Sequence, residues 1–232
     1  AVQACRQQIS FWEKLQRDHP QVDFKPQLAN AYLALSFSLT KGGAVDEAAQ
    51  SWEMAVEMGL SAHTLSRGLK RAGGLELAAS LKRGVWASLL AAPPHPFEPV
   101  PYLRAPWPAY VSLYSALSAH GVLEETPRTV FAVTAGPSLR LSTSLADYSF
   151  HHLPARFMWG FEIRRTEKAA YPLALPEKAL LDTVYLAGVP RSPIGHPAVR
   201  EDGWALDRAL LRRFARRFAV PKVTSWLRRQ GL

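Results

Sequence analysis

Cysteine is nearly absent from this chain of 232 residues, because Cys5 is its only example. An intrachain disulfide therefore cannot form, and a zinc site built from several thiolates is excluded. This cysteine usage is typical of a protein from a reducing compartment. The seven histidines are scattered along the chain, and their spacing matches no metal-binding motif. We therefore expect neither a metal site nor another cofactor.

Long apolar runs are also lacking. The longest stretches, such as 87–92, fall far short of the roughly 20 residues that a membrane-spanning helix requires. The first residues include Gln3 and Arg6, so the apolar segment of a secretory signal is not found there. We therefore expect a cytoplasmic protein that has no membrane segment.

Acidic side chains are the minority: 19 Asp and Glu stand against 28 Lys and Arg, for a net charge of +9. Residues 1–60 are slightly acidic, whereas 61–90 hold five basic residues against Glu76 alone, and only basic charges occur from Arg208 onward. A basic balance favours polyanionic partners. For the C-terminal run, contact with DNA or RNA phosphates and simple solvation of a helix face remain equal alternatives.

The N-terminal part is rich in helical patterns. Apolar residues at helical spacing predict helices over 2–17 and 26–40, and a third helix from Asp46 to Met58 after a paired-glycine break. Helix pairs of this length are similar to tetratricopeptide repeats, so residues 1–45 are interpreted as a tetratricopeptide-like segment. The similarity covers less than two repeats, and such arrays need about three to bury a continuous face.

A helix-turn-helix pattern begins on the third helix. Ala55 allows close helix approach, Gly59 suits a tight turn, and Ser61 is a capping residue for a helix over 62–71. That helix resembles the recognition helix of bacterial repressors, since it places hydroxyl and basic side chains on its outer face. Gly68 weakens it by about 1 kcal/mol relative to alanine and is interpreted as a mark of close packing.

A hairpin is predicted directly after this helix. Residues 75–80 and 85–89 have the pattern of two short strands around the turn 81–84, which is the arrangement of a wing. Basic side chains at the tip of a wing reach the DNA backbone or minor groove. We therefore interpret 46–90 as a winged helix-turn-helix domain. The candidate DNA-binding residues are Ser61, His63, Thr64, Ser66, Arg67, Lys70, Arg71, Lys82 and Arg83.

Proline density over 91–108 predicts a linker, and 109–232 form the second domain. Its patterns predict a helix over 110–121, capped by Ser112, and strands over 129–134, 148–153 and 157–163. A further helix begins at Leu175, and basic helices cover 204–218 and the C-terminus. The predicted fold is thus α+β: N-terminal helices and a winged helix-turn-helix, followed by a mixed α/β domain.

Two ionisable features of this domain are interpreted as structural. His120 falls in the last turn of the first helix, where the helix dipole stabilises a cation. Lys178 and Asp182 form an i, i+4 pair on the helix that begins at Leu175, and Glu177 lies on another azimuth. Carboxylates at metal-binding spacing and a glycine-rich phosphate loop are both absent from the sequence. We therefore expect no enzymatic activity, and a nuclease or nucleotidyltransferase is the less favoured reading.

The motifs together resemble the AbiEi family of abortive-infection antitoxins. The matching segments are YVSLYSALSAHG (110–121), VFAVT (130–134), the FHHL and WGF stretches, and LPEKALLD (175–182). This similarity implies an antitoxin that represses its own promoter through the winged helix, and counteracts a nucleotidyltransferase-like toxin without a stable complex. Palindromic operators are compatible with a dimer on DNA. The alternative is a helical-repeat scaffold that binds a protein partner.

Overall fold

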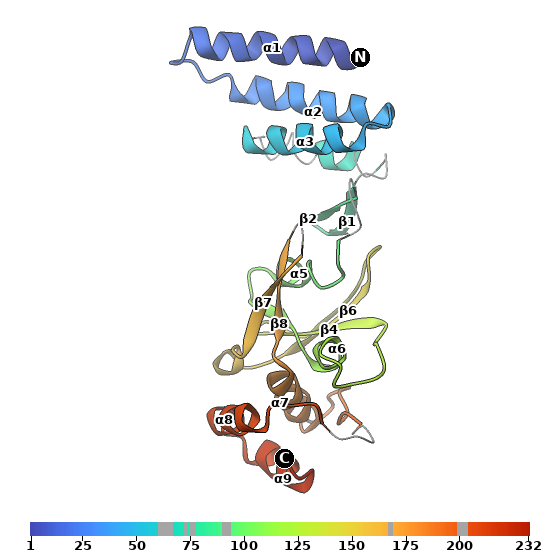
Figure 1. Ribbon diagram of the computed structural model, residues 1–232, viewed down its shortest axis with the longest axis vertical. Coiled ribbons are helices and arrows are strands. Elements are labelled where there is room, and N and C mark those ends of the chain that lie inside the picture. Colours follow the sequence, from blue (N-terminus) through green and yellow to red (C-terminus); the bar gives the residue numbers. More distant parts are fainter. Residues whose placement is uncertain (60–66, 72–73, 75–77, 90–93, 167–168, 199–203) are drawn as a thin grey trace. The chain divides into compact units, whose positions relative to one another are not determined.

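The computed structural model describes residues 1–59, 67–71, 74, 78–89, 94–166, 169–198 and 204–232 (Figure 1). The chain divides into two compact units, Ala1–Pro94 and His95–Leu232. Helices dominate the first unit and a mixed sheet with flanking helices forms the second, so the α+β class predicted from the sequence is confirmed.

Three helices open the first unit: α1 (Val2–Asp18), α2 (Lys25–Lys41) and α3 (Val45–Glu57). These bounds agree with the predicted helices within two residues. The middle helix α2 packs against both α1 and α3. The apolar core between the helices is built from Ile9, Leu28, Ala31, Leu35, Leu39 and Ala48. Periodic apolar residues therefore determine both the helices and their packing.

A two-stranded hairpin completes the first unit. Strands β1 (Ala78–Lys82) and β2 (Val85–Ser88) pair antiparallel. The turn is narrower than predicted, because Leu81 and Lys82 belong to β1 and only Arg83 and Gly84 form the turn. Gly84 has φ +80°, a conformation that favours glycine. Ala78 and Trp86 pack in one apolar cluster with Leu33, Phe37, Trp52 and Ala55, so the hairpin lies against α2 and α3.

A six-stranded mixed sheet forms the centre of the second unit, in the order β5-β6-β4-β3-β8-β7. Its strands are β3 (Ala109–Val111), β4 (Thr129–Thr134), β5 (Leu139–Ser142), β6 (Asp147–His152), β7 (Phe161–Arg165) and β8 (Ala170–Ala174). Strand β3 is antiparallel to β4 and parallel to β8. This central position brings β3 next to the later segments of the unit.

The helices of the second unit are α5 (Val100–Arg104), α6 (Leu113–Ala119), α7 (Pro176–Ala187), α8 (Arg208–Phe218) and α9 (Pro221–Arg229), with a 3₁₀ turn at Ala155–Phe157. Helix α6 packs against β4 and α7, and both α8 and α9 pack against α7 (Figure 1). Over the described ranges, no helix combines the length and the apolar character that crossing a membrane requires.

The structure differs from two predictions at the start of this unit. Tyr110 and Val111 belong to strand β3 rather than to a helix, because both are fully enclosed between neighbouring strands; the helix starts only at Leu113. Within the predicted linker 91–108, residues 100–104 form helix α5 with Val100 and Leu103 buried. Pro101 lies in the first turn of α5, where its missing N–H would have no intrahelical partner.

Candidate functional site

The predicted recognition helix is described only in its second half. Ser61, His63, Thr64 and Ser66 lie outside the described residues, whereas residues 67–71 are helical. Arg67 and Lys70 are exposed, and Arg71 is exposed with its guanidinium carbon 4.7 Å from the ring centre of Phe37. None of these three cations has a carboxylate within ion-pair distance among the described residues. The helix therefore presents three basic groups to solvent.

Gly68 fixes how closely this helical segment approaches α2. The residue is buried, and a Cβ atom added to it would lie 3.3 Å from Leu33 Cδ2 and 3.7 Å from the Trp52 ring. The missing side chain therefore leaves room for Leu33. The packing explains a glycine inside a helix, as the sequence indicates.

The hairpin contributes the other two predicted cations. Arg83 is exposed in the turn, whereas Lys82 is half-buried at the end of β1. Ala78 and Trp86 of the hairpin pack in the apolar cluster of Leu33, Phe37, Trp52 and Ala55, here called the α2–α3 cluster. The strands and this cluster together hold the turn in place. The described candidate nucleic-acid contacts of the first unit are thus Arg67, Lys70 and Arg71 on the helical segment and Lys82 and Arg83 on the hairpin.

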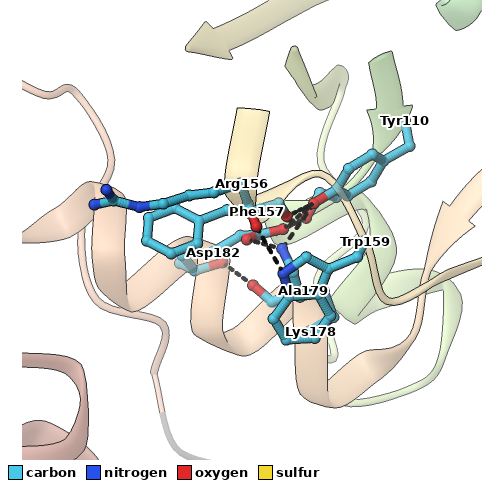
Figure 2. Close-up of polar contacts among 9 residues, drawn as sticks. Tyr110, Arg156, Phe157, Trp159, Lys178, Ala179 and Asp182 are labelled. Atoms are coloured by element: carbon cyan, nitrogen blue, oxygen red, sulfur yellow. Dashed lines mark hydrogen bonds and ion pairs between the residues drawn. The ribbon is translucent and has the colours of Figure 1, made fainter. Parts of the chain in front are cut away.

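A buried polar cluster lies in the second unit (Figure 2). Lys178 and Asp182, one turn apart on α7, form an ion pair and have 0% side-chain exposure. Lys178 Nζ also donates to the Tyr110 hydroxyl at 2.7 Å. Asp182 Oδ2 accepts hydrogen bonds from the Tyr110 hydroxyl at 3.0 Å and from Ser112 Oγ at 2.9 Å. Strand β3 and helix α7 are therefore joined through one network.

Aromatic rings surround the ammonium group of Lys178. Its Nζ lies 5.4 Å from the ring centre of Tyr110, 5.2 Å from that of Trp159 and 5.3 Å from that of Phe218. Each distance permits a cation–π interaction. Gly160, at φ +76°, allows its loop to cover the lysine stem, because a Cβ atom there would be 2.9 Å from Lys178 Cγ. The lysine is thus sealed from solvent by α8 and by this loop.

Burial controls the electrostatics of the cluster. Desolvation raises the pKa of Asp182, and it lowers the pKa of Lys178; the attraction between the two groups opposes both shifts. Burial and the neighbouring Asp182 raise the pKa of Tyr110 well above its ordinary value. Tyr110 therefore remains a neutral hydroxyl that both accepts and donates. Because Lys178 and Asp182 have no exposed side-chain surface, this arrangement joins β3, α7 and α8 rather than meeting a substrate.

The i, i+4 pairing of Lys178 with Asp182 agrees with the prediction, but the pair is a buried one rather than an ordinary surface pair. Sequence reasoning missed Tyr110 and Ser112. The available signal was their i, i+2 spacing, which places both on one face because the backbone is extended from β3 through Ser112. Glu177 lies outside the cluster and accepts a hydrogen bond from the backbone N–H of Asp207 at 2.9 Å.

His120 and the His151–His152 pair have separate environments. His120 follows α6, and its Nε2 is 2.9 Å from the carbonyl oxygen of Ala174. His151 is the last of four consecutive buried residues of β6, and His152, at the end of the strand, is exposed. Burial and the charge of Arg140 lower the pKa of His151 to about 4. His151 Nε2 and Ser149 Oγ are 2.9 Å apart, beside an open pocket of about 670 Å³.

This serine–histidine contact lacks the third group of a catalytic triad. No hydrogen bond from His151 to a carboxylate is present in the part of the chain that the structure describes, so the group that orients the histidine of a catalytic triad is missing there. Among the described residues, no group of three or more His, Cys, Asp or Glu side chains could hold a metal ion. The geometry therefore directs attention to the basic surfaces.

Comparison with protein-family models and with curated protein sequences gives no match for this chain.

Proposed function

We propose that the chain is a DNA-binding regulator, and that its first unit binds the promoter of its own operon. The observation that carries this proposal is the hairpin β1–β2, which presents Arg83 in its turn and packs its other side on the α2–α3 cluster. A basic turn on a fixed hairpin is suited to DNA phosphates and the minor groove. The protein would act in the cytoplasm, where its DNA lies.

The helical residues 67–71 supply the second element of this proposal. Arg67 and Lys70 are exposed, and neither forms an ion pair with a described carboxylate that phosphate binding would have to break. Gly68 holds this segment against Leu33, which limits its freedom relative to α2. In the proposed complex Arg67 contacts base edges in the major groove, and Arg83 contacts the backbone.

The second unit supports the antitoxin part of the proposal. The segments 110–121 and 175–182, on which the similarity to AbiEi antitoxins rests, meet in the cluster of Tyr110, Ser112, Lys178 and Asp182. Two segments that are far apart in the sequence therefore form one hydrogen-bonded cluster. We propose that this unit counteracts a nucleotidyltransferase-like toxin without forming a stable complex, that the chain is not itself an enzyme, and that a dimer on palindromic DNA is compatible with repression.

Substitutions in the first unit test the proposed DNA surface. Binding of the full chain to a labelled fragment from upstream of its own gene is measured by fluorescence anisotropy. Arg67→Ala should reduce affinity for this fragment by about 10- to 100-fold and relax its preference over scrambled DNA. The double substitution Lys82→Ala and Arg83→Ala should weaken binding to both DNAs alike.

The matched control is Lys14→Ala with Arg17→Ala, two exposed cations of α1. This control removes the same charge as the hairpin variant and should retain at least half of the parent affinity. Unchanged binding by the Arg67 variant would refute the recognition helix. Equal, weak binding of the parent to both DNAs would favour the alternative, a helical scaffold for a protein partner.

A further inference from the structure

The net positive charge of the second unit comes from its C-terminal end, residues 204–232. Residues 95–203 contain ten basic and ten acidic residues, so their formal charges cancel. Residues 204–232 contain eight basic residues and one acidic residue, Asp207, which gives a net charge of +7. This segment therefore carries most of the excess of +9 in the whole chain.

Helix α8 separates this charge from its apolar residues. Leu211, Phe214 and Phe218 are buried, and Phe218 stacks on Phe157 with ring centres 4.2 Å apart. On the opposite side, Arg208, Arg212 and Arg216 follow an i, i+4 row, with Arg213 and Arg217 beside it. Consecutive members of such a row lie about 6 Å apart along the helix axis. The carboxylate of Asp207 caps the N-terminus of α8, where it accepts hydrogen bonds from the backbone N–H groups of Ala209 and Leu210.

The three arginines at the centre of this surface lack anionic partners. Arg212, Arg213 and Arg216 are exposed, and no carboxylate lies within ion-pair distance of them among the described residues. Two neighbours are held in place: Arg208 donates to the carbonyl oxygen of Gly231 at 3.3 Å, and the Arg217 guanidinium carbon lies 4.2 Å from the Trp159 ring centre. Within the described part of the chain, the central cations thus have no anionic partner that an external anion would have to displace.

Helix α9 carries further basic residues. Lys222, Arg228 and Arg229 line an open hollow of about 620 Å³ together with His196 and Ser225, and no acidic residue lines it. The exposed basic residues of α8 and α9, two consecutive helices labelled in Figure 1, are here called the arginine surface: Arg208, Arg212, Arg213, Arg216, Arg217, Lys222, Arg228 and Arg229. A surface of one sign with a concave part attracts and concentrates polyanions.

The exposed residues indicate which polyanion is favoured. Exposed large apolar side chains are not found in 204–232, so this surface has no apolar face to insert into a lipid bilayer. Within 204–232 no phenylalanine or tryptophan side chain is exposed for the bases of a single strand to stack on; Trp226 is buried, and the exposed ring of His196 is already stacked on it. What remains is a row of guanidinium groups, which bind phosphates without reading base edges.

We propose that the arginine surface binds the phosphate backbone of double-helical DNA independently of its sequence. The choice of DNA rests on the function proposed above, which assigns sequence recognition to the first unit. The second unit then supplies affinity and salt dependence, whereas Arg67 and the hairpin supply discrimination. Log affinity falls as log salt concentration rises, and each arginine that neutralises a phosphate makes this negative slope steeper by about 0.9.

The test uses the full chain and a scrambled DNA duplex at several salt concentrations. The variant Arg212→Gln, Arg213→Gln, Arg216→Gln is compared with the control Arg128→Gln, Arg164→Gln, Arg165→Gln. The control removes the same net charge from exposed positions outside the surface. We expect the surface variant to lose tenfold or more in affinity at low salt and to lower the salt slope by about 2 to 3. The control should change the slope by less than 1.

Equal losses in the two variants would show an effect of net charge alone and overturn the proposal, as would unchanged binding by the surface variant. Tighter binding of the parent to a single-stranded RNA of the same length, lost in the surface variant, would overturn the assignment to duplex DNA. Near-ultraviolet circular dichroism checks that both variants remain folded, which is expected because all six arginines are exposed.

The same series separates this proposal from the proposed function. If both hold, the surface variant binds native and scrambled fragments more weakly by the same factor, so the ratio of the two dissociation constants is unchanged. If the parent shows no preference for its own promoter, the promoter proposal fails, whereas a selective loss of scrambled-DNA binding in the surface variant would still support the arginine surface.

Discussion

At Lys178 a single side chain links three elements, because its ammonium group contacts Asp182, Tyr110 and the ring of Phe218. A charge at this depth loses its hydration, and its partners must replace that hydration. The buried charge of Asp182 is compensated by its ion pair with Lys178 and by hydrogen bonds from Ser112 and Tyr110. Removing one member therefore leaves the other buried without its partner.

Substitutions of the pair should be strongly coupled. Lys178→Met and Asp182→Asn should each lower the free energy of unfolding by about 3 to 5 kcal/mol, because each leaves an unbalanced buried charge. The double variant should cost less than the sum of the single variants by at least about 1 kcal/mol. Urea denaturation followed by circular dichroism measures all four proteins. Additive losses would show that the two groups do not depend on each other.

His151 should make the stability of the second unit depend on pH. Its folded pKa of about 4 lies below the ordinary value of 6.5, so the unfolded chain binds a proton first as pH falls. Stability should therefore decrease between pH 6.5 and pH 4 and be independent of this group above pH 7. In His151→Gln that contribution to the pH dependence should vanish. Urea midpoints measured at pH 7.5 and 5 for both proteins provide the comparison, and identical pH dependence would contradict it.

Single residues were the least predictable part of the site. The pairing of Lys178 with Asp182 follows from helical spacing, but its burial does not, because Tyr110 lies 68 positions away in sequence from Lys178. Ser112 was correctly placed before a helix, yet its hydroxyl donates to Asp182 instead of capping. Such contacts depend on tertiary packing, which local patterns do not contain.

Among the elements, the N-terminal helices were predicted best, since α1, α2 and α3 match their predicted bounds within one residue. Helix α8 has apolar residues on one side and arginines on the other, but it begins at Arg208 rather than at 204. Strand β3 was mistaken for the start of a helix, because its three residues are followed directly by a helical pattern. Short buried segments carry too few residues for periodicity to identify them.

The two sides of α8 should respond differently to truncation. Phe218→Ala removes a ring that stacks on Phe157 and covers Lys178, so the free energy of unfolding should fall by about 3 to 5 kcal/mol. Arg212→Ala, on the exposed side, should change it by less than about 0.5 kcal/mol. Trypsin cleavage at the arginines of α8 should accelerate only in the Phe218 variant. Equal cleavage of the two variants would contradict the packing described here.

Over the whole molecule, the charge is divided unevenly. Residues 1–94 contain ten basic and eight acidic residues, whereas residues 204–232 alone have a net charge of +7. Half of the ten basic residues of the first unit lie at 67–71 and in the hairpin, and the other half lie on α1 and α2 among most of the acidic residues. The C-terminal helices have many cations on one surface. This division suits a protein in which one unit recognises a DNA sequence and the other adds general attraction to DNA.

The most direct test of DNA regulation by this chain is a salt series of binding to two duplexes of equal length. One is the fragment upstream of its own gene, and the other is its scrambled sequence. We expect the native fragment to bind at least 100-fold more tightly at physiological salt, with affinity for both falling steeply as salt rises. Equal affinity for the two duplexes at every salt concentration would contradict the account.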